Sequence, residues 1–207
     1  DGQQRVCAVQ LNDGSRLPAQ LLVAGIGVEV DLQLALSAGL AVREQDSDAG
    51  MAGICVDERC RSSDPDIYAI GDVTSFRHPA AALPIRLESV QNAVDQARLV
   101  AADLIARSSG AESLVPANPP VPWFWSDQYD VKLQMAGLFS GFDESVVRGD
   151  VASGKFSVLY FRDGQLLAVH SVNMPADHVQ ARKLLAAGVS PTLQQAADET
   201  FKLSSLL

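Results

Sequence analysis

A proline-rich stretch in the middle of the chain separates two parts with different sequence patterns. Its four prolines are Pro116, Pro119, Pro120 and Pro122. Proline has no backbone N–H and a fixed φ, so neither a helix nor an inner strand can run through this stretch. The residues before it predict strands that alternate with helices, whereas those after it predict strands joined by tight turns. The sequence therefore predicts an α/β half followed by an α+β half with an antiparallel sheet.

Two apolar runs at the start of the chain predict a pair of strands, and a later pattern predicts a long helix. Residues 5–11 and 17–25 flank an Asn-Asp-Gly-Ser turn with a hairpin signature. The continuous apolar run at 21–24 predicts that the second strand is buried on both faces. Residues 90–106 have apolar side chains at helical spacing, and Ser89 is a suitable N-cap. These elements are typical of an α/β domain.

One predicted strand in this half ends in a pair of residues suited to binding a ligand. The apolar run from Ile67 to Ile70 predicts the strand, and Gly71-Asp72 follows it directly. Glycine lacks a Cβ, so another backbone or a ligand can approach it closely. Open α/β sheets bind ligands at the carboxyl ends of their strands, where the Asp72 carboxylate can accept hydrogen bonds from hydroxyl groups. The pattern predicts a site for a polyhydroxylated cofactor.

Short segments of strand type dominate the second half. They cover residues 131–137, 145–149, 155–162 and 165–172. The Asp163-Gly164 pair between the last two segments is a strong signal for a two-residue hairpin turn. Residues 176–187 predict a helix, and the tail from 191 to 207 predicts another. We therefore expect an antiparallel sheet accompanied by helices.

Composition argues against several classes of protein. The chain has 207 residues and a formal net charge of −9, which disfavours generic nucleic-acid binding. No apolar run reaches the roughly 18 residues that predict a membrane span. The three cysteines, Cys7, Cys55 and Cys60, are too few for a disulfide framework, which predicts free thiols in a reducing, cytoplasmic setting. The three histidines are scattered and lack metal-ligand spacing, so no metal site is predicted.

Several motifs together resemble one known family. Residues 62–72 are similar to the second flavin-binding motif of FAD-dependent pyridine nucleotide reductases, and residues 86–93 are similar to a segment of their ferredoxin reductase branch. The most specific part is Trp-Phe-Trp-Ser-Asp-Gln at 123–128, and the resemblance continues to Asn173. No Gly-x-Gly-x-x-Gly loop occurs in the chain, so the resemblance is to the C-terminal half only. Since the chain also begins without methionine, we expect it to be part of a longer protein, called the parent below.

The resemblance implies a division into three segments. Residues 1–27 correspond to the end of an NAD-binding domain, and residues 28–112 to the C-terminal segment of an FAD-binding domain. Residues 116–207 correspond to the α+β C-terminal reductase domain. The implied activity of the parent is electron transfer from NAD(P)H through FAD to a ferredoxin-type iron–sulfur protein, and the flavin itself carries out the redox chemistry.

The resemblance also implies which residues bind the flavin. Gly71 and Asp72 correspond to the contact with the ribityl chain of FAD; the alternative for Asp72 is capping of a following turn. Ser89 and Val90 begin the long helix, whose positive dipole end is suited to stabilising the reduced flavin ring. Trp125 corresponds to a ring beside the isoalloxazine. The alternative for each apolar side chain is ordinary core packing, and no side chain is expected to be catalytic.

Two arginines are candidates for docking the redox partner. Ferredoxins are acidic, so Arg86 and Arg98 near the flavin edge are suited to steering them. The alternative is ordinary surface charge, and Glu88 is positioned to form an ion pair with Arg86.

Two other functions stay open at this point. The 207-residue chain alone is expected to be an inactive folded fragment or interaction module, because it lacks a pyrophosphate-binding loop. The other open function is that the parent is a related FAD-dependent NAD(P)H reductase with a different electron acceptor. Strands without their neighbours leave apolar surface exposed, which predicts self-association of the fragment.

Overall fold

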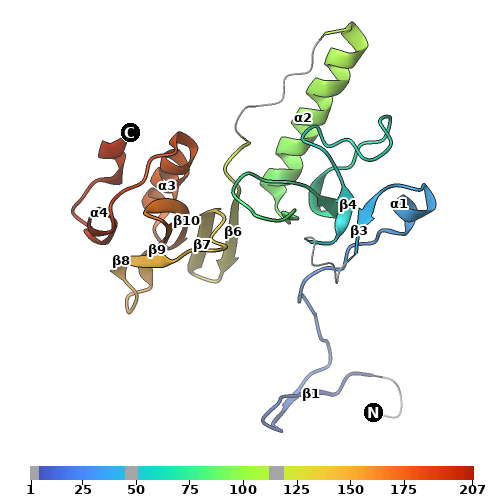
Figure 1. Cartoon of the computed structure of the whole chain (residues 1–207). Coiled ribbons are helices and arrows are strands. Elements are labelled where there is room, and N and C mark those ends of the chain that lie inside the picture. Colours follow the sequence, from blue (N-terminus) through green and yellow to red (C-terminus); the bar gives the residue numbers. More distant parts are fainter. Residues whose placement is uncertain (1–4, 45–50, 112–118) are drawn as a thin grey trace.

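The computed structural model describes residues 5–44, 51–111 and 119–207 (Figure 1). The proline-rich stretch lies partly outside these ranges, because 112–118 is not described. The chain begins with an antiparallel hairpin of β1 (Ala8–Gln10) and β2 (Arg16–Pro18), in which Val9 pairs with Leu17. Within the described ranges, none of the helices has the length and hydropathy that a membrane crossing requires.

The prediction of a doubly buried strand over 17–25 is wrong beyond Pro18. Residues 19–25 form no strand, and Leu21, Leu22 and Val23 are 80%, 58% and 84% exposed. A strand buried on both faces requires neighbouring strands and covering helices, and no described element pairs with this segment. The run has the composition of an inner strand but lacks the partners that would make it one.

A small mixed sheet follows, and it carries the predicted ligand-binding turn. The helix α1 (Gln33–Ser37) precedes β3 (Val42–Arg43), which pairs antiparallel with β4 (Gly53–Cys55). β4 in turn pairs in parallel with β5 (Thr74–Ser75).

The strand predicted over 67–70 is replaced by less regular structure. Tyr68 makes only an isolated bridge with Arg61. Gly71-Asp72 then begins a one-turn 3-10 helix, η1 (Gly71–Val73), directly before β5. The pair predicted to bind a ligand therefore precedes a strand and does not follow one.

The long helix α2 (Val90–Ser109) is confirmed, and it has an unusual distribution of polarity. Ser89 is its N-cap, and Gly110 ends it in a left-handed conformation at φ 69°. Its buried residues are Gln96 and Asp103, both polar. An apolar stripe at four- and three-residue spacing lies exposed instead, formed by Val90, Val94, Ala97, Ala101 and Leu104.

The second half is an antiparallel sheet with helices, as predicted, but it has five strands, because Trp123–Gln128 forms a strand that was not predicted. Its strands are β6 (Trp123–Gln128), β7 (Val131–Gly137), β8 (Glu144–Asp150), β9 (Lys155–Arg162) and β10 (Gln165–Val172), in the order β6-β7-β10-β9-β8. The β9–β10 hairpin turns at Asp163 and Gly164, whose φ values of 51° and 73° are those of a type I′ turn. The boundaries predicted for β7, β9 and β10 agree with the structure.

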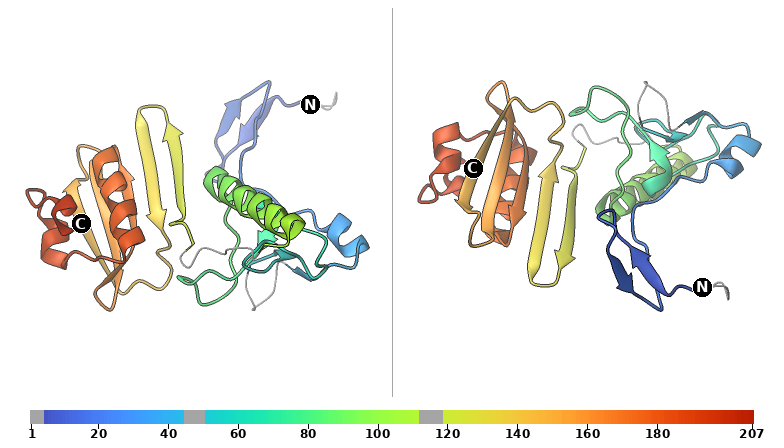
Figure 2. Two further views of the ribbon diagram at one scale, coloured as in Figure 1. Left: turned by 90° about the horizontal axis from the view of Figure 1, so that it is seen from above. Right: turned by 90° about the horizontal axis from the view of Figure 1, so that it is seen from below.

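Two helices pack against this sheet, α3 (Pro175–Ala187) and α4 (Leu193–Ala197), and the 3-10 helix η2 (Leu203–Leu206) packs against α3. Figure 2 shows α3 lying along one face of the sheet. The buried core consists of Leu159, Phe161, Leu166, Val169, Ala181, Leu184, Ala196 and Leu203. This half therefore has a core formed by its own residues.

One buried arginine, Arg148, forms hydrogen bonds that connect residues 196–201 to the sheet. Arg148 on β8 is 6% exposed and donates hydrogen bonds to the main-chain oxygens of Ala196, Asp198, Glu199 and Phe201. Its Nε lies 3.3 Å from Asp177 Oδ2 on α3.

Candidate functional site

The backbone at Gly71 is held from both sides. Its N–H donates to Oε1 of Gln96 on α2 at 2.6 Å, and its carbonyl oxygen accepts from Thr74 Oγ1 at 2.8 Å. The φ of 77° is one that L-residues rarely adopt. A Cβ at this position would meet only the Ala93 Cβ, at an ordinary 3.5 Å. Glycine is therefore required here by backbone conformation, and not by the close approach that the sequence suggested.

The Asp72 side chain points into open space. Asp72 is exposed, and its carboxylate makes no hydrogen bond to any residue in the described part of the chain. The turn has no side-chain cap, so the capping alternative for Asp72 is not seen. Its carboxylate is therefore available to accept hydrogen bonds from a ligand.

The N-terminus of α2 is a second open polar group on the same body. Ser89 Oγ accepts from the Asn92 N–H at 3.1 Å, which is its cap contact. Val90 and Gln91 are the first two helical residues, and their N–H groups have no intrahelical acceptor. Val90 is 64% exposed, so ordinary core packing does not describe its side chain in this structure. The helix end therefore offers two N–H donors and a positive dipole to an electron-rich ligand.

The two tryptophans of β6 differ in their surroundings. The ring of Trp123 lies 4.5 Å below the Arg182 guanidinium and 5.8 Å from the His178 ring, both on α3. Trp125 stacks 5.3 Å from Trp123 and remains 39% exposed. Trp123 therefore serves as packing between β6 and α3, whereas Trp125 has a free surface suited to a flat ligand.

A cleft lies between α2 and α3 beside these rings. Its volume is about 360 Å³, and its walls include Asp95 of α2, Trp123 of β6, and Arg182 and Lys183 of α3. Neither α3 cation was identified from the sequence, because only the packing of α3 on the sheet brings them near Trp123. A larger cavity of about 550 Å³, with Leu99 in its wall, lies along α2.

The two predicted docking arginines lie in different environments. The Arg86 side chain is 8% exposed and its Nη1 lies 2.7 Å from Glu88 Oε1, which is the ion pair anticipated from the sequence. Arg98 on α2 is 76% exposed, with Nη1 3.7 Å from Asp95 Oδ1. Arg98 is therefore accessible to a partner, while Arg86 has a structural contact in this chain.

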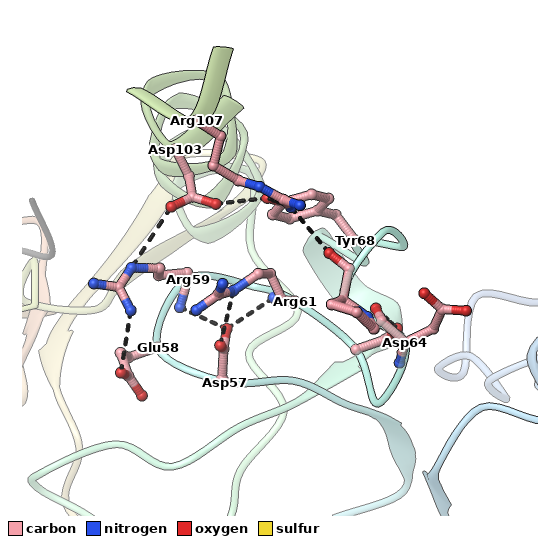
Figure 3. A network of polar contacts seen from close by, with 10 residues as sticks. Asp57, Glu58, Arg59, Arg61, Asp64, Tyr68, Asp103 and Arg107 are labelled. Carbon is pink, nitrogen blue, oxygen red and sulfur yellow. Dashed lines mark hydrogen bonds and ion pairs between the residues drawn. The ribbon is translucent and has the colours of Figure 1, made fainter. Parts of the chain in front are cut away.

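A polar network ties the segment before Gly71 to the far end of α2 (Figure 3). Tyr68 Oη donates to Asp103 Oδ2 at 2.5 Å, and Arg59 Nε lies 3.5 Å from Asp103 Oδ1. Arg107 donates to Tyr68 Oη and to the Pro65 carbonyl, both at 2.9 Å. These contacts fix the chain that leads into Gly71-Asp72 against the helix, so the turn and α2 form one unit.

The cysteines and histidines show no metal-binding arrangement. The three thiols are free, and burial raises the pKa of Cys60 to about 11, with a smaller contribution from the charge of Asp57. Within residues 5–44, 51–111 and 119–207, no group of three or more acidic, histidine or cysteine side chains could hold a metal ion.

Comparison with known sequence families gives two matches that divide the chain. Residues 1–97 match the pyridine nucleotide-disulphide oxidoreductase family, and residues 123–207 match the reductase C-terminal family. The α/β unit with the Gly71-Asp72 turn falls in the first match, and the antiparallel sheet with its tryptophans falls in the second. Fold and site together define the class as a pyridine nucleotide-linked oxidoreductase with a C-terminal reductase domain.

Curated relatives narrow this class. Rhodocoxin reductase of Rhodococcus erythropolis is 48% identical over 96% of the chain, and putidaredoxin reductase of Pseudomonas putida is 38% identical over 99%. The chain belongs to the pyridine nucleotide-disulphide oxidoreductase family, in its ferredoxin reductase branch. It spans 43% and 45% of the lengths of these two relatives.

Solved structures agree with this assignment. A ferredoxin reductase from Rhodopseudomonas palustris is 44% identical and superposes with a TM-score of 0.82, covering 97% of this chain and 46% of its own. The reductase in the covalent putidaredoxin reductase–putidaredoxin complex is 38% identical, also with a TM-score of 0.82, and covers 97% of this chain and 44% of its own. The predicted fold class is confirmed.

Proposed function

We propose that the chain is the C-terminal half of a cytoplasmic flavoprotein reductase that passes electrons from NAD(P)H through FAD to a ferredoxin-type iron–sulfur protein. Residues 1–27 would close an NAD-binding domain, residues 28–112 would contribute to an FAD-binding domain, and residues 116–207 would form the reductase domain. The observation that carries this proposal is the outward Asp72 carboxylate on the same body as the open N-terminus of α2.

The residues of this chain fit FAD in two places. Asp72 would accept hydrogen bonds from the ribityl hydroxyls, and a charged acceptor forms shorter and stronger bonds than a neutral one. The Val90 N–H at the α2 N-terminus, capped by Ser89, would donate to the pyrimidine edge of the ring. FAD, when bound, supplies hydride acceptance and single-electron transfer.

The remaining site residues would shape the surroundings of the flavin. Trp125 would cover one part of the ring system and exclude water, held in place by Trp123 behind it. The α2 dipole favours negative charge at its N-terminus, so this helix would stabilise the reduced, anionic flavin.

Docking of the iron–sulfur protein would use the cations beside the cleft. Arg98, Arg182 and Lys183 lie on the helices that form its walls, and Arg86 remains a further candidate. Basic side chains around a redox site accelerate encounter with an acidic partner. The covalent complex solved for putidaredoxin reductase supports a protein partner of this kind.

The alternative is that the 207-residue chain alone is a folded module without turnover. The flavin contacts described above form only one side of a site, and no pyrophosphate-binding loop occurs in the sequence. We expect the purified chain to be colourless or to contain much less than one flavin per chain, and to show negligible NADH oxidation with an artificial acceptor. The parent should be yellow and active in the same assay, and rapid turnover by the chain alone would contradict the half-site assignment.

The role of Asp72 is testable in the parent. We expect Asp72→Ala to weaken FAD binding by about tenfold to a hundredfold, because a charged hydrogen bond is lost. Asp130→Ala is the matched control, since Asp130 is an exposed carboxylate in the β6–β7 turn. An unchanged FAD dissociation constant in Asp72→Ala would show that the assigned contact is wrong.

A further inference from the structure

A closed ring of hydrogen bonds surrounds the turn that bears Asp72. The Gly71 N–H donates to Gln96 Oε1 at 2.6 Å, and Gln96 Nε2 donates to Thr74 Oγ1 at 3.3 Å. The Thr74 hydroxyl hydrogen completes the ring by donating to the Gly71 carbonyl at 2.8 Å. The Gly71 carbonyl also accepts from the Thr74 backbone N–H, and all three residues are buried. Both backbone groups of Gly71 are therefore fixed without help from solvent.

This ring determines where the neighbouring carboxylate points. Asp72 makes no side-chain hydrogen bond of its own within the described residues, so its direction follows from the backbone of η1. That backbone depends on Gly71 keeping a φ of 77°. The side-chain amide of Gln96 stabilises this conformation by accepting the hydrogen bond of the Gly71 N–H. Without Gln96 this buried N–H would lose its acceptor, which costs free energy.

The same side chain joins two parts of the flavin site. Gln96 is less than two helical turns from Val90, on the face of α2 that packs against η1. Ala93 lies on the same face, and its Cβ would be 3.5 Å from a Cβ placed at Gly71. The helix N-terminus and the Asp72 carboxylate therefore belong to one body whose internal spacing depends on the Gln96–Gly71 contact.

We infer that Gln96 is a positioning residue for the flavin, acting through Gly71 to aim the Asp72 carboxylate at the ribityl chain. This inference rests on the proposed function, since it takes FAD as the ligand. Gln96 itself is buried behind the turn and would not touch the flavin.

The hydrogen bond is testable in the 207-residue chain without any flavin. Gln96→Met keeps the length of the side chain and removes both polar groups. We expect the Gly71 amide to exchange with solvent at least about tenfold faster in this variant, as measured by NMR. Gln180→Met is the matched control, because Gln180 is a half-buried amide on α3 whose Oε1 has no hydrogen-bond partner among the described residues. It should leave the exchange rate of the Gly71 amide unchanged.

The positioning role is testable in the parent by a double-mutant cycle. We expect Gln96→Met to weaken FAD binding about tenfold to a hundredfold. In an Asp72→Ala background the same substitution should cause no further loss, because Gln96 acts through the Asp72 carboxylate. A purely structural role predicts independent, additive losses.

Each outcome decides one part of the argument. Additive losses, or unchanged FAD binding in Gln96→Met, overturn the positioning role even if Gly71 exchange is faster. Unchanged Gly71 exchange overturns the hydrogen-bond basis. If the unsubstituted parent binds no FAD, both the proposed function and the role of Gln96 are overturned. This outcome can be told apart from a failure of the Gln96 role alone, because it is measured on the parent before any substitution is made.

Discussion

The two halves of the chain differ in the side chains that they bury. In the C-terminal sheet domain the fully buried side chains include Leu159, Phe161 and Leu184, each 0% exposed. In α2 the buried side chains are instead Gln96 and Asp103, at 7% and 1% exposed. The apolar stripe of α2 is left open to solvent.

The C-terminal domain buries its apolar side chains against one another, whereas the apolar stripe of α2 is not covered by the described residues. Each fully buried Val, Leu or Phe side chain contributes about 1.5–3 kcal/mol to folding, and the C-terminal domain collects this contribution from its own residues. The stripe of α2 contributes little until something covers it. The polar residues of α2 serve another purpose, since they hold Gly71 and Tyr68 in place.

The largest expected effect concerns the C-terminal domain. Arg148→Met would leave the largely buried Asp177 without its cation and four main-chain oxygens without their donor. Breaking a buried pair of this kind typically costs about 3–5 kcal/mol. The measurement is urea unfolding of the 207-residue chain followed by tryptophan fluorescence, because Trp123 and Trp125 both lie in this domain.

The matched control for this variant is Arg162→Met at the exposed end of β9. A surface substitution of this type should change the free energy of unfolding by no more than about 0.5 kcal/mol. If Arg148→Met and Arg162→Met unfold at the same urea concentration, the C-terminal segment is held by something other than Arg148.

An intermediate effect concerns the apolar stripe of α2. We expect the chain to self-associate through this stripe, as patches of this kind promote association. Introducing Val94→Lys together with Leu104→Lys should raise the dissociation constant about tenfold to a hundredfold, because two apolar contacts would be replaced by like charges. Light scattering over a range of concentrations measures this. Val147→Lys on β8 is the control, since Val147 is exposed to the same degree as Leu104; an unsubstituted chain that is monomeric throughout would refute the prediction.

The smallest effect is a pH dependence of the stability of the C-terminal domain. Burial lowers the pKa of His170, and burial together with the Arg182 charge lowers the pKa of His178, each below the ordinary value of 6.5. The unfolded chain therefore binds more protons as the pH falls through about 6.5, so stability is present above this pH and is lost below it. The slope is at most about 1.4 kcal/mol per pH unit for each histidine.

The measurement is the urea concentration at the midpoint of unfolding, followed by tryptophan fluorescence at pH values from 7.5 to 5.5. This range includes the ordinary histidine pKa of about 6.5. His170→Phe should reduce the slope. Burial also lowers the pKa of His78, but His78→Phe should leave this slope unchanged, because both tryptophans lie in the other half. Equal slopes in all three proteins would exclude the histidines as its source.

The sequence predicted best those elements whose determinants are local. Alternating side chains and the Asp163-Gly164 turn determine β9 and β10 within a few residues, so their boundaries were correct. Residues 19–25 were predicted wrongly because strand formation there depends on distant partners. The helix α2 was predicted from its apolar spacing, yet the apolar face is the exposed one.

The candidate site shows the same division. Asp72, Ser89 and Val90 could be identified from motifs, and the structure leaves Asp72 and the α2 N-terminus open to a ligand. The contacts of Gln96 with Gly71, and the position of Arg182 and Lys183 beside Trp123, are made across 25 residues or more of sequence. No local pattern encodes such contacts, so only the folded arrangement could show them.

The acceptors of Arg148 have a consequence for how this domain can vary among related proteins. All four are main-chain oxygens between residues 196 and 201, so the contact depends on the path of the backbone and hardly on which side chains the segment carries. Replacing Glu199, which is exposed, should therefore be tolerated. Inserting or deleting a single residue there would displace the acceptor oxygens from Arg148. We therefore expect this segment to tolerate substitutions but to keep a constant length.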